Sequence, residues 1–202
     1  MKTATQKRKD LRAMLSAGNI LCVPGVGDAL TAKIAQMAGI QCLAMGGYSV
    51  TAVHLAQPDV GLLSMSEMAT ALKEICDATD IPVIADGDNG YGNALNVIRT
   101  ESEFEKAGAA CIFFEDQVWP KRCGHMDGKQ VITADEHVQK IRAAVEARVD
   151  KETRSWRART AGRCMALRTP LNAANGMRTP GRKCCLLTAS APGKRLNGLQ
   201  KN

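Results

Sequence analysis

The sequence predicts an α/β protein organised around a parallel β-sheet. Over the first 150 residues, short apolar runs alternate four times with amphipathic stretches of helical period. The runs are apolar throughout rather than at every second position, which is typical of strands buried on both faces of a parallel sheet. Repeated βα units of this kind form either a TIM-type barrel or a doubly wound sheet, and the residues alone leave both possibilities open.

Four strands are predicted, each a short apolar run that leads into glycine or acidic residues. The first is NILCVPG, residues 19–25, and the others are residues 42–47, 82–88 and 110–116. Polar and charged residues gather where the last three runs end. Because the carboxyl ends of parallel strands share one edge of the sheet, where active sites of such folds lie, we expect the functional residues there.

Four helices are predicted between and after the strands. They cover residues 28–39, 64–79, 93–108 and 133–149, where apolar residues recur at helical spacing. The predicted end signals are an N-cap at Asp28, at Ser64 or Ser66, and at Thr133, with a stop at Gly39.

Size and composition predict one globular domain. The chain has 202 residues, 45% of them hydrophobic, but only seven are aromatic, so aliphatic side chains and Met must supply the core. No apolar run is long enough for a membrane span or a signal peptide, so we expect a cytoplasmic protein. The eight cysteines are irregularly spaced without a C-x-x-C pair, and there are only three histidines. These features argue against a disulfide framework and a structural zinc site.

The charge of the chain changes abruptly near residue 152. Residues 153–202 hold eleven Lys or Arg residues and no acid, whereas residues 1–152 have a net charge of −4, so the overall +7 belongs to the last quarter. That segment shows no strand run and no helical stripe, and three prolines interrupt it. A basic tail of this kind suits a polyanionic partner, but the absence of interleaved aromatic residues does not favour nucleic acid.

The strongest local signal is a pair of carboxylates in the stretch ADGDNGYGN. Asp86 and Asp88 follow the third predicted strand, and the glycines around them let a ligand approach the backbone. Oxygen ligands at such a turn suit Mg²⁺, which takes one or two carboxylates and keeps several waters. Glu115 and Asp59, the latter in QPDVG, lie at comparable positions. A turn with solvated acids explains the first pair equally well, but it does not explain all four acids.

A second signal is Cys123 in the stretch PKRCGH. Lys121, Arg122 and His125 surround the thiol with cationic or imidazole groups, which favour a reactive thiolate. The connection formed by residues 116–133 is longer than an ordinary loop and is typical of an active-site lid. Taken alone, the cysteine is better explained as an incidental surface thiol.

Five stretches together resemble the isocitrate lyase and phosphoenolpyruvate mutase superfamily, most closely its methylisocitrate lyase-like members. They are CVPGVGDALTAKIAQMAG, LAMGGYSVTA, QPDVGLLSMSEM, PVIADGDNGYGNALNVIRT and IFFEDQVWPKRCGH. The resemblance runs from about Leu11 to Val149. It implies a TIM (β/α)8-type barrel, present here only as about the first four βα units and followed by an irregular basic tail. It also implies a Mg²⁺ or Mn²⁺ cofactor, a small carboxylate substrate, no membrane partner, and a tetramer in intact relatives.

The resemblance implies a role for each candidate residue. Asp86 would bind the metal directly, Cys123 would be the general acid/base, and Met45 stands where the lyases usually have serine. The complete implied set is Asp86, Asp88, Glu115 and Asp59 for the metal, Cys123, Lys121 and His125 for catalysis and lid closure, and Met45, Gly46, Gly47 and Gly124 for the substrate.

The implied reaction is the cleavage of a carbon–carbon bond in a 2-hydroxy-tricarboxylate such as 2-methylisocitrate, giving an oxo acid and succinate. A cysteine at position 123 favours the lyases, because the mutase and hydrolase branches usually carry another residue there. The alternatives are an oxo-acid decarboxylase or a phosphonomutase-type member, and a non-catalytic product whose basic tail binds a polyanion.

The resemblance stops near Lys151, where relatives continue with an apolar fifth strand that ends in A-R-T-D. Here Ala158, Arg159 and Thr160 are followed by Ala161. An acid-free segment rich in Arg, Pro, Ala, Gly and Cys is typical of out-of-frame translation of a GC-rich gene. We therefore divide the chain into a barrel half, residues 1–151, and a non-homologous tail, residues 152–202, that is out of frame or disordered. We expect open edges on the first and fourth strands and weak or no activity.

Overall fold

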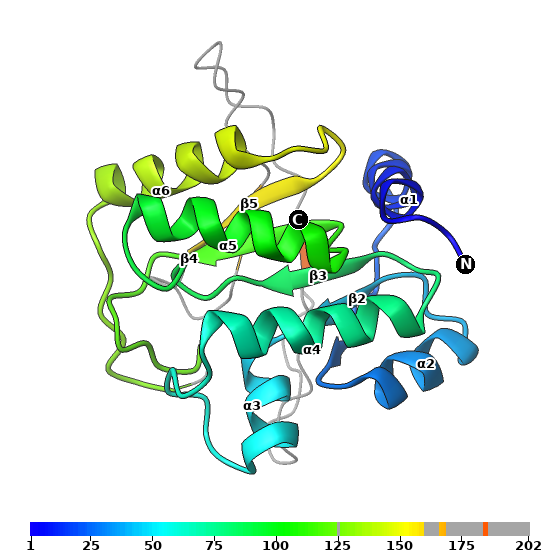
Figure 1. Ribbon diagram of the computed structural model, residues 1–202, viewed down its shortest axis with the longest axis horizontal. Coiled ribbons are helices and arrows are strands. Elements are labelled where there is room, and N and C mark those ends of the chain that lie inside the picture. Colours follow the sequence, from blue (N-terminus) through cyan, green and yellow to red (C-terminus); the bar gives the residue numbers. More distant parts are fainter. Residues whose placement is uncertain (125, 160–165, 169–183, 186–202) are drawn as a thin grey trace, which may run out of the picture.

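Five parallel strands form the centre of the protein in a computed structural model that describes residues 1–124, 126–159, 166–168 and 184–185. Neighbouring strands follow the order of the chain (Figure 1). A doubly wound sheet reverses its strand order part-way, so the sequential order favours the barrel type. The strands are β1 (Gly25–Val26), β2 (Leu43–Met45), β3 (Val83–Asp86), β4 (Cys111–Glu115) and β5 (Arg154–Arg159).

The helices that follow the strands lie on one face of the sheet, in front of the strands in Figure 1. They pack side by side in the order α2 (Ala29–Met37), α4 (Met65–Ala78), α5 (Ala94–Ala107) and α6 (Ala134–Ala147). Leu43, Ile112 and Phe114 of the sheet are fully buried against this layer. A single helical layer outside a sequentially ordered parallel sheet is the wall of a barrel. The predicted fold class, a partial TIM-type barrel, is therefore confirmed.

The helix ends agree with the end signals predicted from the sequence. Asp28 caps α2, and Thr133 caps α6. Ser64, rather than its alternative two residues later, caps α4 in a capping box with Glu67. Gly39 follows the end of α2 with φ of 89°, a conformation that favours glycine.

A helix that the sequence did not predict, α1 (Ala4–Ser16), covers part of the opposite face of the sheet. Leu11 of this helix is fully buried and packs with Ala44, Ile84 and Phe113, which point to the inner side of the barrel wall. These three alternate with the residues that face the outer helices, as strand geometry requires. Since α1 has a polar and basic sequence, its apolar stripe is too narrow to reveal it.

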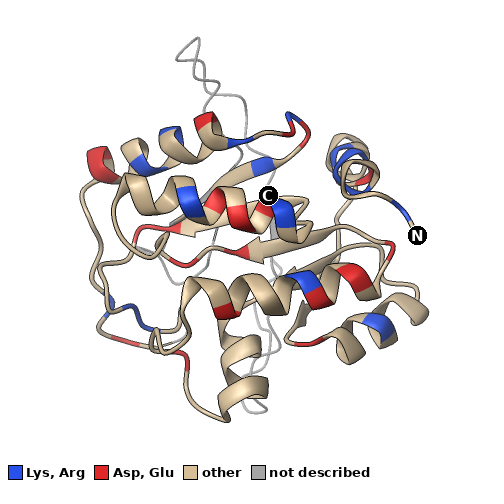
Figure 2. Ribbon diagram, in the orientation of Figure 1, with Lys and Arg blue, Asp and Glu red and all other residues tan. Residues whose placement is uncertain are grey.

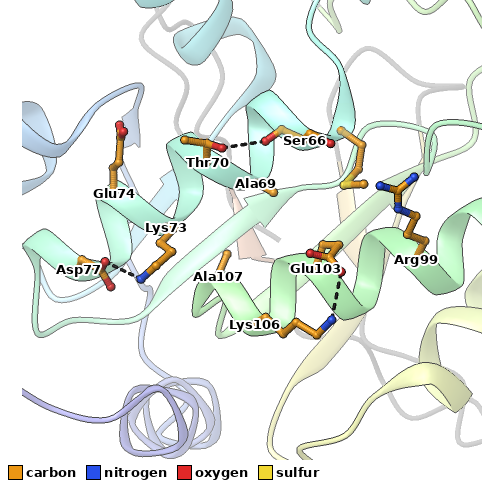
Figure 3. Close-up of a pocket in the computed structure, with 11 residues that line it drawn as sticks. Ser66, Ala69, Thr70, Lys73, Glu74, Asp77, Arg99, Glu103, Lys106 and Ala107 are labelled. Atoms are coloured by element: carbon orange, nitrogen blue, oxygen red, sulfur yellow. Dashed lines mark hydrogen bonds and ion pairs between the residues drawn. The ribbon is translucent and has the colours of Figure 1, made fainter.

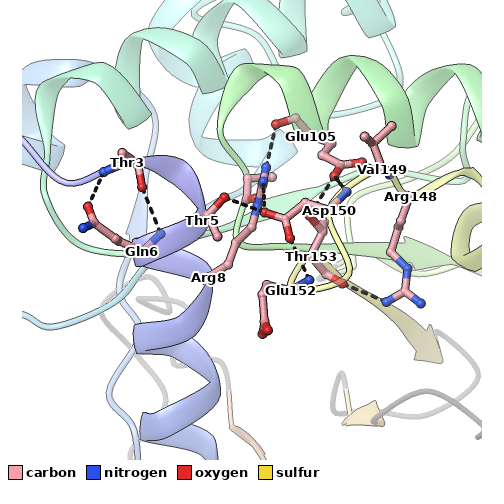
Figure 4. A network of polar contacts seen from close by, with 11 residues as sticks. Thr3, Thr5, Gln6, Arg8, Glu105, Arg148, Val149, Asp150, Glu152 and Thr153 are labelled. Carbon is pink, nitrogen blue, oxygen red and sulfur yellow. Dashed lines mark hydrogen bonds and ion pairs between the residues drawn. The ribbon is translucent and has the colours of Figure 1, made fainter.

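Buried polar contacts fix α1 at the amino ends of the strands (Figure 4). Arg8 donates hydrogen bonds to the carbonyl oxygens of Glu105 and Ala109 and pairs with Asp150 at 2.7 Å. The carboxylate of Glu105 in turn accepts the N–H of Val149 at 2.9 Å. This network closes the end of the sheet away from the candidate site.

The first predicted strand is shorter than expected. Only Gly25 and Val26 pair with β2, whereas Ile20 within the predicted run is 98% exposed. Pro24, which has no N–H, and the position of β1 at the edge of the sheet leave the earlier residues without a ladder partner. The prediction of a buried strand over residues 19–25 is therefore wrong for most of its length.

The short helix α3 (Gly47–Leu55) follows β2 directly and was also not predicted. It carries no Lys, Arg, Asp or Glu, whereas the other helices do (Figure 2). An apolar sequence without a one-sided stripe gives no helical period, which explains why it was missed. Among the described residues, no helix is both long and apolar enough to span a bilayer.

The segment after residue 150 contains strands, which corrects the prediction that it has none. β5 pairs with β4 over five residues, from Arg154 opposite Cys111 to Ala158 opposite Glu115. The edge of the fourth strand is therefore covered, because the backbone of β4 offers hydrogen bonds to any extended partner. β6 (Ala166–Arg168) and β7 (Cys184–Cys185) then continue the sheet in antiparallel order, unlike a barrel. Within the described residues, the outer edge of β1 has no strand partner.

Candidate metal and substrate site

The four carboxylates singled out in the sequence lie in one buried cluster at the carboxyl end of the sheet. Asp86 ends β3, Asp88 follows it, Glu115 ends β4, and Asp59 lies between α3 and α4. Their exposed fractions are 7%, 3%, 4% and 5%. Burial of several acids is costly unless they bind a cation or hydrogen-bond donors, so this cluster is not a turn of solvated acids.

Lys121 reaches the cluster from the loop that follows β4. Its ammonium donates a hydrogen bond of 2.7 Å to Oδ2 of Asp59 and forms an ion pair with Oδ1 of Asp88. Burial opposes the charged ammonium, but the attraction of Asp88, Asp86 and Asp59 outweighs it and raises the pKa of Lys121. The lysine is therefore positively charged, and its single charge compensates only part of the cluster.

The backbone holds Asp86 in place. Its Oδ2 accepts the N–H of Gly47 at 2.9 Å, and its Oδ1 accepts the N–H of Asp88 at 3.0 Å. A β-carbon on Gly47 would lie 2.9 Å from Nζ of Lys121 and 3.3 Å from Oδ2 of Asp86. The start of α3 thus approaches the cluster as closely as a residue without a side chain permits.

The turn after β3 adds a tyrosine that the sequence analysis did not assign. Asp88 and Tyr91 both have positive φ, 49° and 58°, in a turn that also contains Gly90 at φ 83°. This backbone directs the hydroxyl of Tyr91 to Oδ2 of Asp88, to which it donates a hydrogen bond of 3.0 Å. The tyrosine lies within the ADGDNGYGN motif, and this position was the signal by which the sequence could have identified it as a site residue.

Gln117 is a second residue that was missed, and it joins Glu115 to the loop. Its amide nitrogen donates to Oε2 of Glu115 at 2.6 Å and to the carbonyl of Arg122 at 2.8 Å, while its oxygen accepts the N–H of Arg122 at 3.1 Å. Since Gln117 directly follows the acidic end of the fourth strand, its position was the only hint in the sequence.

The electrostatics of the cluster call for a further cation. Burial and the charge of Asp88 raise the pKa of Asp86 to about 7, and burial and Asp86 raise the pKa of Glu115 to about 8. The pKa of Asp88 is also raised, mainly by burial. A divalent cation would remove the repulsion that causes part of these shifts. The oxygen-only donor set fits Mg²⁺ or Mn²⁺ in its chemistry.

The donors are close together but are not arranged as a ready-made metal site. In the part of the chain that the structure describes, no group of three His, Cys, Asp or Glu side chains could hold a metal ion as it stands. Lys121 bridges Asp59 and Asp88, and both oxygens of Asp86 accept backbone hydrogen bonds. Metal binding would therefore need some of these contacts to rearrange.

The residues expected to bind substrate have different surroundings. Met45 is fully buried in the core between the sheet and the helices, so only its backbone reaches the end of β2. Gly46 is the N-cap of α3, and Gly47 is its first residue, with its N–H bonded to Asp86. Gly124 is exposed. His125, expected to help close the lid, lies outside the described residues.

Cys123 lies in the connection that the sequence predicted as a lid. We call residues 116–124 and 126–133 the lid hairpin, because Ile132 donates its N–H to the carbonyl of Asp116, and Val118 donates to Gln130, both at 2.9 Å. The thiol of Cys123 is two residues from Lys121, and the residue is only 8% exposed. The hairpin therefore brings a buried thiol and a buried ammonium to the same edge of the sheet.

A cavity of about 640 Å³ lies elsewhere, between α4 and α5 (Figure 3). Four of its charged lining residues form ion pairs along their own helices, Lys73 with Asp77 at 2.6 Å and Lys106 with Glu103 at 3.0 Å. None of the candidate site residues lines it. We therefore place the functional site at the carboxylate cluster and not in this cavity.

Comparisons with known proteins identify close relatives of the chain. The family model described as phosphoenolpyruvate phosphomutase matches residues 11–168. A 2,3-dimethylmalate lyase of Eubacterium barkeri is 49% identical over 142 residues, which are 70% of this chain and 49% of that protein. A probable 2-methylisocitrate lyase of Corynebacterium glutamicum is 45% identical over 148 residues, 73% of this chain and 48% of that protein.

Solved structures give the same picture. A structure of oxaloacetate acetylhydrolase in complex with 3,3-difluorooxalacetate matches with a TM-score of 0.75 and 34% identity, over 79% of this chain and 56% of that chain. A phosphonopyruvate hydrolase complex with oxalate and Mg²⁺ matches with a TM-score of 0.66 and 34% identity, over 76% and 53% of the two chains. The chain spans about half the length of the curated relatives that it matches.

Proposed function

The chain belongs to the phosphoenolpyruvate mutase/isocitrate lyase superfamily, and from this premise we propose that its site serves a magnesium-dependent carbon–carbon lyase acting on a small 2-hydroxy carboxylate. One observation carries the proposal. Four buried carboxylates and the Lys121 ammonium meet at the carboxyl edge of the sheet, and the buried Cys123 belongs to the same lid hairpin as Lys121.

The cluster is suited to hold the metal. Asp86 would bind the cation directly, and Asp59, Asp88 and Glu115 would bind it directly or through water. When bound, the cation supplies Lewis-acid polarisation of the substrate oxygens. The protein contributes the position and the low exposure of the donors, which strengthen electrostatic interactions at the site.

Cys123 is the proposed acid of the cleavage step. The substrate hydroxyl loses its proton to a carboxylate of the cluster, the carbon–carbon bond breaks, and the new carbonyl forms at the hydroxyl carbon. The electron pair of the broken bond passes to the carbon of the departing succinate fragment that bears a carboxylate, and the thiol of Cys123 donates its proton to that carbon. Lys121, which pairs with Asp59 and Asp88, would hold the lid hairpin against the carboxylates, with Cys123 two residues further along the hairpin.

The substrate class follows from chemistry shared by the relatives. Lyases of 2,3-dimethylmalate, isocitrate and 2-methylisocitrate are among the proteins most similar to this chain. Each name denotes a hydroxy acid with at least two carboxylates, which suits a cation and backbone N–H groups at the start of a helix. We favour 2-methylisocitrate, giving an oxo acid and succinate, with 2,3-dimethylmalate as the nearest alternative.

The test is cleavage of 2-methylisocitrate, isocitrate and 2,3-dimethylmalate by the purified chain, with Mg²⁺ and with a chelator. We expect cleavage to require Mg²⁺ and to be lost in Cys123→Ser. Cys22→Ser is the matched control, because Cys22 is exposed and lies outside the cluster. Metal-independent cleavage, or cleavage that Cys123→Ser leaves unchanged, would contradict the proposal.

We expect the activity of this 202-residue chain to be weak, because it spans about half the length of the curated relatives that it matches. Turnover near about one per second or faster, an ordinary enzyme rate, would contradict this expectation. If turnover is below detection, ligand binding decides the matter. Mg²⁺ with oxalate should raise the melting temperature more than either alone, and no such increase would contradict a carboxylate-binding metal site.

A further inference from the structure

We propose that Trp119 is a positioning residue: its indole packs on Gly61 and holds the lid hairpin closed, which places Lys121 and Cys123 at the carboxylate cluster. The inference rests on the proposed function for the roles of Lys121 and Cys123. The packing itself needs neither metal nor substrate, so it is tested separately.

The contact between Trp119 and Gly61 is the first observation. A β-carbon on Gly61 would lie 2.8 Å from Cη2 of the indole and 3.2 Å from both Cζ2 and Cζ3. Gly61 also has φ of 79°, a conformation that side chains rarely adopt. The six-membered ring of Trp119 therefore packs directly on the backbone of Gly61. A side chain on residue 61 would displace the ring.

The second observation is that the same indole lies beside Tyr91. The two ring centroids are 6.2 Å apart with an interplanar angle of 51°, a tilted arrangement that is favourable for aromatic pairs. Tyr91 is itself fixed by its hydrogen bond to Asp88. Trp119 thus touches two segments that lie outside the lid hairpin.

Trp119 and Lys121 connect the lid hairpin to the same two segments of the chain. Lys121 binds Asp59 and Asp88, while Trp119, two residues earlier, contacts Gly61 and Tyr91. Each partner of the indole is two or three residues beyond a partner of the ammonium. The lid hairpin is therefore joined to the same two loops twice, once by charge and once by packing.

The packing of Trp119 on Gly61 matters because the ion pairs of Lys121 depend on whether a metal ion is bound at the carboxylates. A divalent cation at the carboxylates would repel the ammonium of Lys121 and compete for Asp59 and Asp88. Packing of an indole on a glycine does not depend on charge. It would keep the hairpin closed when the cation is bound, which is when Cys123 must face the substrate.

Trp119 can be replaced without opening the core. Its side chain is at the surface, 43% exposed, whereas the other tryptophan of the chain, Trp156, is 2% exposed. The two halves of the lid hairpin are also joined to each other by backbone hydrogen bonds. A truncation at Trp119 should therefore loosen the hairpin and leave the rest of the fold intact.

The experiment measures how fast each cysteine of the native chain reacts with iodoacetamide, peptide by peptide, by mass spectrometry. Cys123 is 8% exposed and should react only when the lid hairpin opens, whereas Cys22 is exposed and serves as the internal reference. In Trp119→Ala we expect Cys123 to react about tenfold faster with Cys22 unchanged, the population change expected from losing an ordinary aromatic contact.

Further variants separate this packing from a general loss of structure. Trp119→Phe, which keeps an aromatic ring for Gly61, should restore most of the protection of Cys123. Gly61→Ala should expose Cys123 as Trp119→Ala does, and the double variant should add little, because both remove one contact. Met126→Ala removes another partly exposed apolar side chain of the lid hairpin and should change nothing.

An unchanged rate for Cys123 in Trp119→Ala would overturn the proposal, and so would additive effects of the two single variants. If Trp119→Ala unfolds, the buried Cys42 and Cys111 will react as well, and Trp119→Phe with Gly61→Ala then decide. A chain whose melting temperature Mg²⁺ with oxalate does not raise, but in which Cys123 is still protected by Trp119, would contradict the proposed function and leave this inference standing.

Discussion

At the scale of single residues, the site holds more acidic than basic side chains. Lys121 is the only cation that contacts the four carboxylates among the described contacts, and it pairs with two of them. The closeness of Gly47 to Lys121 and Asp86 shows how little space remains in the cluster. A metal ion would therefore enter by taking over contacts that protein groups now make.

Replacement of Asp86 tests the metal site most directly. In Asp86→Asn we expect Mg²⁺ or Mn²⁺ affinity to fall by at least about tenfold, because the loss of a carboxylate ligand should exceed the effect of altering an outer-shell partner. Calorimetric titration with Mn²⁺ measures the change.

Asp77→Asn is the matched control, since Asp77 is an exposed acid on α4 that pairs with Lys73. Its metal affinity should equal that of the unmodified chain. Equal affinity in Asp86→Asn would mean that Asp86 is not a metal ligand.

At the scale of elements, β5 fits the sheet through its backbone better than through its side chains. Its N–H and C=O groups pair with β4 along the strand. Around it, however, several buried polar atoms have no hydrogen-bond partner among the described residues: Glu101 Oε2, Arg154 Nε and Trp156 Nε1. Such atoms are rare in native cores, so β5 carries side chains that do not match the layer that it joins.

Glu101 predicts how stability changes with pH. Burial raises its pKa from 4.5 to about 8, although a hydrogen bond from Ser155 opposes the shift. A folded-state pKa above the unfolded value gives stability that is complete below pH 4.5 and is lost as pH rises through about 8. Glu101→Gln should remove this part of the loss, and urea unfolding across that range measures the difference. Identical pH profiles for the two proteins would show that Glu101 is ionised in the folded state.

Substitutions of Trp156, in the same strand, distinguish the contribution of packing to stability from that of hydrogen bonding. Its ring is buried in the inner cluster, but its N–H has no hydrogen-bond partner in the part of the chain that the structure describes. Trp156→Phe should therefore change the free energy of unfolding little or increase it, whereas Trp156→Ala should lower it by about 3–5 kcal/mol. Chemical denaturation measures both. A large loss of stability in Trp156→Phe would mean that the indole N–H is satisfied in solution.

At the scale of the whole molecule, the chain covers about half the length of its relatives, and the described sheet has an open edge at β1. Next to this edge, α2 exposes three apolar residues that follow one another at intervals of about one helical turn. Leu30, Ile34 and Met37 are 70%, 56% and 79% exposed. Edges and stripes of this kind favour self-association.

We therefore expect the chain to associate and to be poorly soluble at moderate concentration. Ile34→Lys should shift the size distribution measured by light scattering towards the monomer. Leu95→Lys, which adds the same charge at an apolar residue of α5 that is 73% exposed against 56% for Ile34, should not. Equal effects of the two substitutions would indicate a general effect of charge rather than association through α2.

We propose that the abrupt basic composition after residue 152 results from out-of-frame translation, a hypothesis that the unpaired polar atoms around β5 support. Shifting the reading frame of the gene near codon 153 should then restore an apolar fifth strand ending in A-R-T-D and further βα units. Sequencing the gene tests this. If no single-base shift restores them, the hypothesis is wrong.

The sequence by itself determined the periodic parts of this protein. Continuous apolar runs and capping residues such as Ser64 and Thr133 located the later strands and four helices, because burial and helix ends depend on local patterns. The candidate acids were also evident, since each follows an apolar run or a glycine-rich turn.

Only the tertiary structure decided what depends on contacts distant in the sequence. β5 exists because β4 offers its edge, whatever side chains follow, and α1 is fixed by Arg8 reaching residues about one hundred and more positions away. The same holds for the bridge of Lys121 to Asp59, which are 62 residues apart, and for the packing of Trp119 on Gly61. Local patterns carry no information on such pairings, because the free energy that selects them arises only when the chain is folded.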